Sequence, residues 1–176
     1  MDNNDYIIRR ATIDDLDEVT ELEAVCFPPA EAASRESFEW RLKTYPQHFF
    51  VMVKDGRIIS FVNGPVTVEA DLIDEMFDYP SYSNDEGDWQ MIFGVATHPD
   101  YQRKGYASIV MRHFIDHAKA DGRKGVVLTC KEAKLHFYST FGYIDEGLSK
   151  SNHGGVPWHQ MRCRFGNDKE KVKSED

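Results

Sequence analysis

Cysteine is scarce in this chain of 176 residues, and the few cysteines form no pattern. Cys26, Cys130 and Cys163 are far apart and odd in number. This spacing gives neither a disulfide framework nor a zinc motif, so no metal is expected. Each cysteine is better explained as a small apolar residue than as a nucleophile.

Long apolar runs are also missing. No stretch approaches the roughly 20 apolar residues that a membrane-spanning helix needs. The first five residues, Met-Asp-Asn-Asn-Asp, are polar and acidic, unlike the start of a secretory signal peptide. We therefore expect a cytoplasmic protein without a membrane partner.

Positive charge is in deficit. The chain has 21 lysines and arginines against 30 aspartates and glutamates, a formal net charge of −9. This balance disfavours nonspecific binding to nucleic acid, so no nucleic-acid partner is expected. The 41% of hydrophobic and 29% of charged residues are typical of a globular protein with an ordinary core.

The length and the lack of an internal repeat or linker predict one domain over residues 1–165. Residues 166–176 are charged, almost free of apolar side chains and predicted to be disordered. Hydrophobic periodicity predicts the order β-α-α-β-β-loop-β-α-β-α-β-β, a mixed α/β fold. Seven strands are expected, at residues 6–9, 49–53, 58–66, 91–96, 125–130, 143–149 and 157–165. Helices are expected at about 12–26, 34–45, 105–121 and 133–141, with a short amphipathic helix around 72–77 inside an acidic insertion, 67–88.

Two local signals mark element boundaries. Thr12 and Asp15 have the spacing of a near capping box at the start of the first helix. The pair Asp55-Gly56 supplies the positive φ angles of a hairpin turn between two predicted strands.

The most informative stretch runs from Val95 to Ser108. An apolar run before it predicts a buried strand, and the pattern after it predicts a helix that begins near Gly105. The free N–H groups and positive dipole end of a helix start bind anions, and Gly105 lets the backbone approach a ligand. Arg103 and Lys104 add positive charge. The stretch lacks the glycines of a Walker loop or a dinucleotide fingerprint, so it predicts another phosphate or pyrophosphate turn, with an ordinary strand–turn–helix as the alternative.

A second informative stretch runs from Leu135 to Tyr143. Tyr138 lies on a predicted short helix after a buried strand, where its side chain can face the same cleft as the turn. A phenol has an ordinary pKa of about 10, so it is protonated at neutral pH and can donate a proton to a leaving group. The alternative is that Phe137, Tyr138 and Phe141 are core aromatics of this helix.

These two motifs together resemble the GNAT acetyltransferases. Gln102–Ala107 fits the pattern Gln/Arg-x-x-Gly-x-Gly/Ala of the loop in which that family holds acetyl-coenzyme A. Phe137–Tyr143 fits Phe-Tyr-x-x-x-Gly-Tyr/Phe, a run in which the GNAT tyrosine is often the general acid. The resemblance implies the GNAT fold, a central twisted sheet of about seven strands flanked by four or five helices.

Within the GNAT enzymes, the chain most resembles the arylalkylamine (serotonin) N-acetyltransferases and their microbial relatives. The similarity spans nearly all of residues 6–165, through segments 22–28, 34–46, 56–64, 98–107 and 130–138. It implies that Tyr138 protonates the coenzyme A thiolate. It also implies a coenzyme A site in which the pantetheine arm pairs with the backbone of Val95, Ala96 and Thr97, and the pyrophosphate turn comprises Gln102, Arg103, Lys104, Gly105, Tyr106, Ala107 and Ser108.

One position departs from the animal enzymes of that group. They carry a His-x-His pair on the central strand as a proton route from the amine, and Met91 and Phe93 stand there in this chain. Another base is then needed. Glu23 is the first candidate because the first helix is expected to meet the substrate cleft. A solvated helix carboxylate is the alternative for Glu23, and the weaker candidates are His136 and His159.

The resemblance therefore predicts an acetyl-coenzyme A-dependent N-acetyltransferase in which a small arylalkylamine-type primary amine attacks the thioester directly. The backbone amide of Val95 or Ala96 would stabilise the oxyanion. Three early aromatic side chains shape either an apolar amine pocket or the core, and core packing explains them at least as well: Phe27, Phe38 and Trp40.

Other functions stay open at this stage. The acidic insertion 67–88 would suit a polyamine, a lysine or a protein N-terminus, although a solvated connection explains its acidic residues more simply. A non-catalytic acyl-coenzyme A-binding module is a further alternative. A homodimer through the final hairpin is also open.

Overall fold

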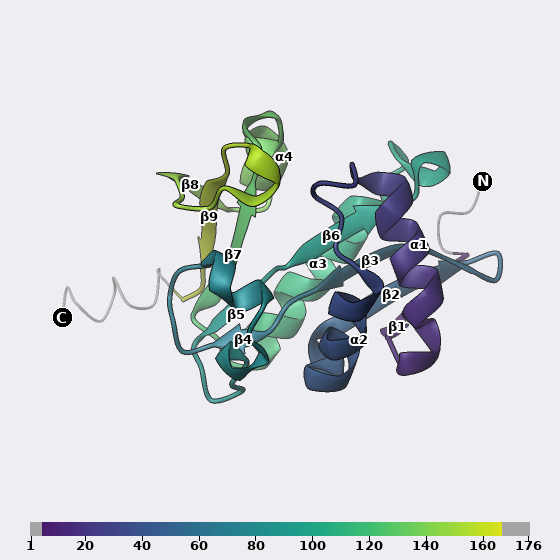
Figure 1. Cartoon of the computed structure of the whole chain (residues 1–176), viewed down its shortest axis with the longest axis horizontal. Coiled ribbons are helices and arrows are strands. Elements are labelled where there is room, and N and C mark those ends of the chain that lie inside the picture. The colour runs from purple at the N-terminus through teal and green to yellow at the C-terminus, as the bar shows by residue number, and fades with distance from the viewer. Residues whose placement is uncertain (1–4, 167–176) are drawn as a thin grey trace.

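The computed structural model describes residues 5–166, which form two sheets that diverge from a common centre (Figure 1). The four-stranded sheet is antiparallel and has the order β1 (Ile7–Arg10), β2 (Phe49–Lys54), β3 (Arg57–Asn63), β6 (Gly94–Thr97). In the five-stranded sheet only β5 and β7 are parallel, and the order is β4 (Val66–Thr67), β5 (Trp89–Met91), β7 (Gly125–Cys130), β9 (His159–Arg164), β8 (Ile144–Leu148). The predicted mixed α/β fold is confirmed.

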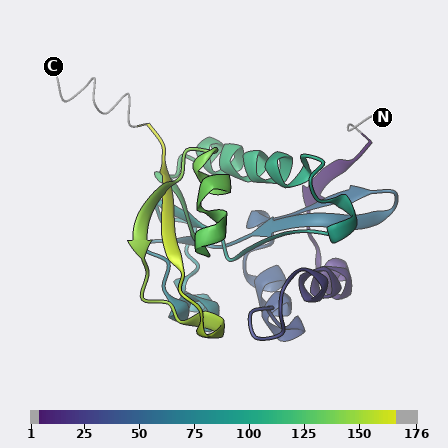
Figure 2. The ribbon, with the colours of Figure 1, turned by 90° about the horizontal axis from the view of Figure 1, so that it is seen from above.

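Helices cover both faces of the four-stranded sheet. Within residues 5–166 the α-helices are α1 (Leu16–Cys26), α2 (Arg35–Thr44), α3 (Tyr106–Ala120) and α4 (Leu135–Ser139). Figure 2 shows α3 on one face of this sheet and α1 with α2 on the other. Side chains alternate along β2, so Phe50 and Met52 pack in the core with α3, whereas Phe49 and Val51 pack with α1 and α2.

Both local boundary signals are confirmed. The Thr12 N–H donates to the Asp15 carboxylate at 2.8 Å, and the Thr12 side chain caps the 3₁₀ turn Ile13–Asp15 that leads into α1. Asp55 and Gly56 have φ angles of 54° and 76°, as the turn between β2 and β3 requires.

Two predicted strands are each divided between the sheets, so residues 5–166 contain nine strands in place of the expected seven. The strand expected at 58–66 becomes β3 and β4, and that at 91–96 becomes β5 and β6. The Ile92 N–H donates to the Val127 carbonyl on β7, and the Phe93 N–H donates to the Asn63 carbonyl on β3, both at 2.8 Å. The chain changes its hydrogen-bonding partner between these two residues, and this change begins the separation of the sheets.

Two predicted helices were too long. The helix expected at 133–141 is a 3₁₀ turn, Glu132–Lys134, followed by the five residues of α4. The helix expected near 72–77 is a 3₁₀ turn, Asp74–Phe77, and a second 3₁₀ turn, Pro80–Tyr82, lies where a loop was expected. The amphipathic pattern is nevertheless used, because Leu72 and Met76 are buried against Trp89, Met91 and Val127.

β8 forms one edge of the five-stranded sheet. Two apolar side chains on it, Ile144 and Leu148, are 69% and 67% exposed. The homodimer through this hairpin stays a prediction.

The remaining predictions concern the chain ends and membranes. The predicted tail, apart from Gly166, lies outside the described residues. Within residues 5–166, no helix combines the length and the apolar composition needed to cross a membrane.

Candidate active site

The described part of the chain leaves one edge of β6 free. β6 is the last strand of the four-stranded sheet, with β3 on one side. On its other side the sheets separate, because β7 pairs with β5 and β9 instead (Figure 1). An edge of this kind can bind an extended chain by adding it as a further strand.

The carbonyl groups of β6 alternate in direction. The Ala96 carbonyl accepts a hydrogen bond from the Ser60 hydroxyl on β3 at 2.7 Å. The Thr97 carbonyl instead accepts from the Gln102 side chain at 2.9 Å, away from β3. Val95 is two residues before Thr97, so its backbone groups point the same way. The register therefore favours Val95 and Thr97 over Ala96 for contact with a ligand at this edge.

The turn before α3 has the backbone of an anion site. Gly105 is the left-handed cap of α3 with φ 89°, and Arg103 is also left-handed with φ 63°. Left-handed residues that alternate with residues of negative φ direct successive backbone N–H groups toward one point. Residues 102–105 are exposed, and a Cβ on Gly105 would meet no atom within 4 Å. The predicted helix start is confirmed, and the space in front of it is open.

Two side chains of this turn contact the rest of the protein. The Gln102 side chain ties the turn to β6 through its bond to Thr97. Tyr106 is 3% exposed and packs edge-on against Tyr6, with ring centroids 6.1 Å apart. Only the backbone of Tyr106 is therefore available to a ligand, as are the backbones of the half-buried Ala107 and Ser108. The charged side chains of this turn that could contact a ligand are those of Arg103 and Lys104, which are exposed.

Tyr138 is brought to the carboxyl end of β7 by α4. Its ring packs edge-on against Phe137 and Tyr143, with centroids 5.1 and 5.9 Å away. Burial raises the pKa of Tyr138, so the hydroxyl holds its proton through the neutral range. Cys130, at the end of β7, has a pKa raised to about 11 by burial, so it is a thiol rather than a nucleophilic thiolate. The Tyr138 ring is a core aromatic, as the alternative interpretation held, and its phenol is in the state that proton donation requires.

Glu23 is buried rather than solvated. It is 6% exposed on α1, and its Oε2 accepts the Ala33 N–H at 2.8 Å. Its Oε1 is buried without a hydrogen-bond partner among the described residues. Burial raises the pKa of Glu23, opposed by the Ala33 N–H and by the charges of Arg41 and His153. A carboxylate with one free oxygen and a raised pKa is suited to accept a proton.

The position of Glu23 relative to β6 follows from its helix. Cys26 lies three residues later, on the same face of α1, and its thiol donates to the Thr97 carbonyl at 3.3 Å. The end of α1 that carries Glu23 therefore packs against β6.

A buried polar network near Gly94 was missed by the sequence analysis. The Asn63 Oδ1 accepts from the Tyr45 hydroxyl at 2.7 Å and from Arg41 at 3.5 Å. A Cβ placed on Gly94 would lie 3.6 Å from Asn63 Nδ2 and 4.0 Å from Arg41 Nη1. Within residues 5–166, Asn63 Nδ2 and Arg41 Nε have no hydrogen-bond partner. These two nitrogens can therefore still donate hydrogen bonds, close to Gly94 at the start of β6.

Aromatic rings surround this network. The Arg41 guanidinium lies 5.1 Å from the ring centre of Phe38 and 5.2 Å from that of Phe93. Phe93 also packs against Phe77, with centroids 4.4 Å apart, and edge-on against Trp40. Phe38 is fully buried and belongs to the core, whereas Trp40 and Phe93 are half-buried. Trp40 was named from the sequence as a candidate for an amine pocket. Phe77 and Phe93 come from distant segments, so they were not assigned to that pocket from the sequence.

Two loops meet across the divergence of the sheets. Glu31, between α1 and α2, pairs with Lys131 at 2.8 Å. The Glu31 carbonyl lies 3.0 Å from Nε2 of His153, in the loop between β8 and β9. A Cβ on Gly154 would lie 2.8 Å from Glu31 Cγ, so these loops are in close contact. They bridge the two halves of the domain on the side where α1 carries Glu23.

The weaker histidine candidates lie elsewhere. His136 is exposed on α4, and His159 Nδ1 is 3.1 Å from an Asp145 carboxylate oxygen on β8. The acidic insertion is also less free than expected. Asp71 pairs with Arg162 at 2.6 Å, and Asp74 accepts the Ser151 hydroxyl at 2.6 Å.

The sequence match to a known family identifies the family of this chain. Residues 16–143 match the family described as Acetyltransferase (GNAT) family, over more than half of the chain. The chain belongs to the GNAT acetyltransferase family. The GNAT fold expected from the motifs is therefore confirmed, whereas the arylalkylamine subfamily stays a prediction.

Solved structures show the same fold at low sequence identity. The GphF GNAT-like decarboxylase in complex with isobutyryl-CoA is 18% identical, with a TM-score of 0.79 over 90% of this chain and 98% of that one. The ribosomal-protein-S18-alanine N-acetyltransferase from Escherichia coli is 18% identical, with a TM-score of 0.69 over 91% and 94%. The NatC complex bound to Gag peptide and CoA matches at 13% identity, with a TM-score of 0.72 over 92% and 99%. At such identities the likeness concerns the fold alone.

Proposed function

We propose that this GNAT protein transfers the acetyl group of acetyl-coenzyme A to the primary amine of a small arylalkylamine-type acceptor. The observation that carries the proposal is Glu23, a buried carboxylate with a free oxygen on the end of α1 that packs against the free-edged strand β6. Acetyl-coenzyme A supplies the activated acetyl group when bound.

The backbone supports this cosubstrate. The backbone groups of Val95 lie at the free edge of β6 and would pair with a pantetheine arm, whereas the Thr97 carbonyl already accepts a hydrogen bond from the Gln102 side chain. The N–H groups at the start of α3 lie beside the open space at Gly105, which would suit a pyrophosphate. The Val95 N–H would stabilise the carbonyl oxygen as negative charge develops on it.

Two side chains would move protons. Glu23 would take the proton from the acceptor ammonium, directly or through one water, so that the neutral amine attacks without an acyl-enzyme. Tyr138 would protonate the departing thiolate, since its raised pKa keeps the phenol neutral. The enzyme's other contribution is to hold the two substrates in line.

The aromatic rings support the acceptor class. Trp40 and Phe93 are half-buried near the start of β6, where an aromatic amine can pack against them. The pairing of Asp71 and Asp74 within the protein leaves less free negative charge for a polyamine.

The test is a free-thiol release assay with acetyl-coenzyme A and tryptamine, phenethylamine, spermidine, a lysine peptide, an alanine-starting peptide or no amine. We expect the highest kcat/KM with an arylalkylamine. Turnover only with spermidine or a peptide would contradict the proposed arylalkylamine acceptor but would still support acetyl transfer to an amine. No turnover, with coenzyme A binding in calorimetry, would instead support a non-catalytic binding module.

A further inference from the structure

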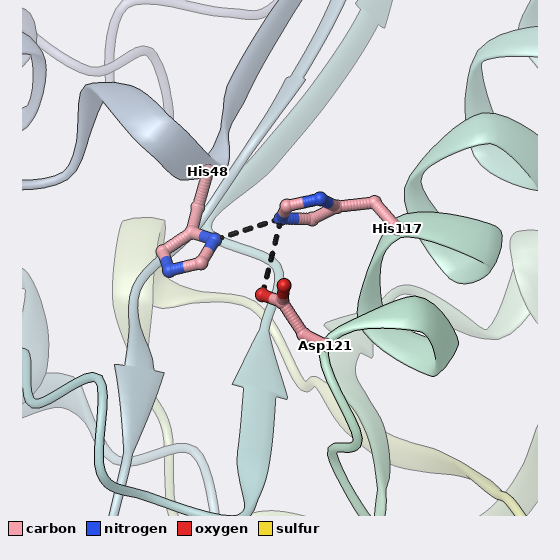
Figure 3. Close-up of side chains that lie close together, drawn as sticks. All are labelled: His48, His117 and Asp121. Carbon is pink, nitrogen blue, oxygen red and sulfur yellow. Dashed lines mark hydrogen bonds and ion pairs between the residues drawn. The ribbon is translucent and has the colours of Figure 1, made fainter.

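Three side chains form a compact cluster at the carboxyl end of α3. Nδ1 of His48, just before β2, lies 2.9 Å from Nε2 of His117, and Asp121 Oδ2 lies 3.6 Å from the same His117 nitrogen (Figure 3). One ligand atom from each residue falls within 4.8 Å of the others. Gly105 caps the opposite end of this 15-residue helix, about 22 Å away, so the cluster is separate from the proposed pyrophosphate turn.

We propose that His48, His117 and Asp121 bind a divalent zinc ion. Two imidazoles and a carboxylate are typical zinc ligands, and three protein ligands leave a fourth position for water. No sequence motif predicted this site, because His48 and His117 are 69 residues apart in the chain.

A second carboxylate prepares His48 for this role. Asp85 Oδ1 lies 2.9 Å from His48 Nε2, and an ionised carboxylate can only accept a hydrogen bond. The His48 proton is therefore on Nε2, and the lone pair of Nδ1 faces His117. Zinc-bound histidines characteristically donate their other N–H to a carboxylate in this way. Asp85 is itself held by the Gln47 side chain at 2.9 Å.

All three ligand atoms lie within 4.8 Å of one another, and two of their distances can be compared with those of a tetrahedral zinc site. Ligands about 2.0–2.2 Å from zinc stand about 3.3 Å apart at tetrahedral angles. The His48–His117 distance of 2.9 Å must open slightly, and the His117–Asp121 distance of 3.6 Å must close slightly. Without the ion, one proton shared between the two ring nitrogens holds them together, and zinc would replace that proton.

The surroundings leave one side of the cluster open to an ion. The His48 side chain is 2% exposed and that of Asp121 34%, so an ion reaches the cluster from the Asp121 side. Phe50 packs against the His117 ring, with centroids 5.0 Å apart. Two positive charges oppose a cation here: Arg123 lies 3.5 Å from Asp121, and the charge of Arg10 acts on His117. A bound ion would join the start of β2 to the end of α3.

The test uses the full chain after treatment with a chelator and gel filtration. Titration with zinc sulfate in a calorimeter should give one site per chain and raise the unfolding temperature, and cobalt(II) should give the absorption bands of a tetrahedral complex. H117A and the milder H117Q should lose the site. H113A should keep it, because His113 packs on Phe50 but offers no ligand atom to the cluster.

An orientation test separates this site from adventitious binding. Asp85→Asn removes the carboxylate that sets the His48 proton, and should weaken zinc binding about 10- to 100-fold. Circular dichroism confirms that each variant is folded before titration. Zinc binding of equal strength in folded H117Q or in Asp85→Asn, or no binding to the wild-type chain, would overturn the proposal.

Discussion

Tyr138 and Glu23 are both buried, and burial raises the pKa of each side chain with a different consequence. A phenol with a raised pKa remains the proton donor across the neutral range. A carboxylate with a raised pKa holds an abstracted proton more firmly than an exposed carboxylate does. The same physical cause therefore keeps the Tyr138 phenol protonated and makes the Glu23 carboxylate a stronger base.

Replacing Tyr138 with phenylalanine tests the acid. The ring and its packing remain and only the proton is lost, so kcat should fall about 100-fold or more, with the coenzyme A affinity unchanged in calorimetry. Tyr143→Phe is the matched control, because that hydroxyl is also buried but donates to the Met111 sulfur at 3.3 Å. An equal loss of kcat in both variants would show that packing, not proton donation, is affected.

Replacing Glu23 with glutamine tests the base through two independent readouts. Since the folded state binds the Glu23 proton more tightly than the unfolded chain does, the ionised carboxylate destabilises the fold at any pH above its raised pKa. Glu23→Gln should therefore raise Tm at pH 7 and leave it nearly unchanged at low pH, where the wild-type carboxyl is protonated. Its kcat should fall at least about 100-fold.

The pH profile gives a further check on Glu23. Wild-type activity should drop as pH falls through the raised pKa of Glu23, and this limb should be absent from the residual activity of Glu23→Gln. Glu21→Gln, an exposed position on the same helix, should alter neither activity nor Tm. A Glu23→Gln enzyme with full activity would leave Glu23 only a structural role.

At the scale of elements, α3 is held at both ends by left-handed glycines. Gly105 begins the helix with φ 89°, and Gly122 follows it with φ 81°. A Cβ at either glycine would meet no atom within 4 Å. An alanine at either position would therefore be disfavoured by the positive φ angle alone and not by a steric clash. Only Gly105 lies at the proposed pyrophosphate turn.

This pair provides a controlled substitution. Gly105→Ala and Gly122→Ala should each cost about 1 kcal/mol of unfolding free energy, because alanine disfavours positive φ. Only Gly105→Ala should raise the coenzyme A Kd, by about tenfold, since its methyl group enters the space that a phosphate would take. Urea unfolding and calorimetry measure the two effects. Equal coenzyme A affinities in the two variants would place the pyrophosphate elsewhere.

At the scale of the whole molecule, the two sheets join where Gly64 crosses the end of β5. A Cβ on Gly64 would lie only 1.9 Å from the Met91 carbonyl oxygen. The Met91 N–H donates to the Pro65 carbonyl at 2.8 Å, so the two segments cannot move apart without breaking this contact. The close approach of these backbones sets the divergence that leaves the β6 edge free.

Gly64→Ala should therefore destabilise the protein by about 3 kcal/mol, since the obstructing atoms belong to the backbone. Gly94→Ala is the stability control, because its Cβ would meet nothing closer than 3.6 Å, which is ordinary contact. Urea unfolding should give a clear loss for Gly64→Ala and a change within about 1 kcal/mol for Gly94→Ala. Equal stabilities would mean that the junction can relax.

Features that depend on neighbouring residues were predictable from the sequence. The Thr12 capping box, the Asp55-Gly56 turn and the start of α3 at Gly105 each rest on local backbone chemistry, and all three are confirmed. The family motif at residues 102–107 is likewise a local feature, because its residues are neighbours in the sequence. The lengths of α4 and of the turn at 74–77 were overestimated, because apolar spacing does not distinguish an α-helix from short 3₁₀ turns.

The sequence by itself determined the mixed α/β class, the strand–turn–helix that begins α3 at Gly105, and the GNAT membership that its motifs implied. Only the tertiary structure decided the division of two strands between sheets, the burial of Glu23, the polar network of Arg41 and Asn63, and the approach of His48 to His117. The apolar pattern of a strand is the same whichever sheet the strand joins, so the sequence does not show where a strand changes sheets. A carboxylate on a helix likewise has no local mark of burial, because burial depends on segments that meet it only after the chain has folded.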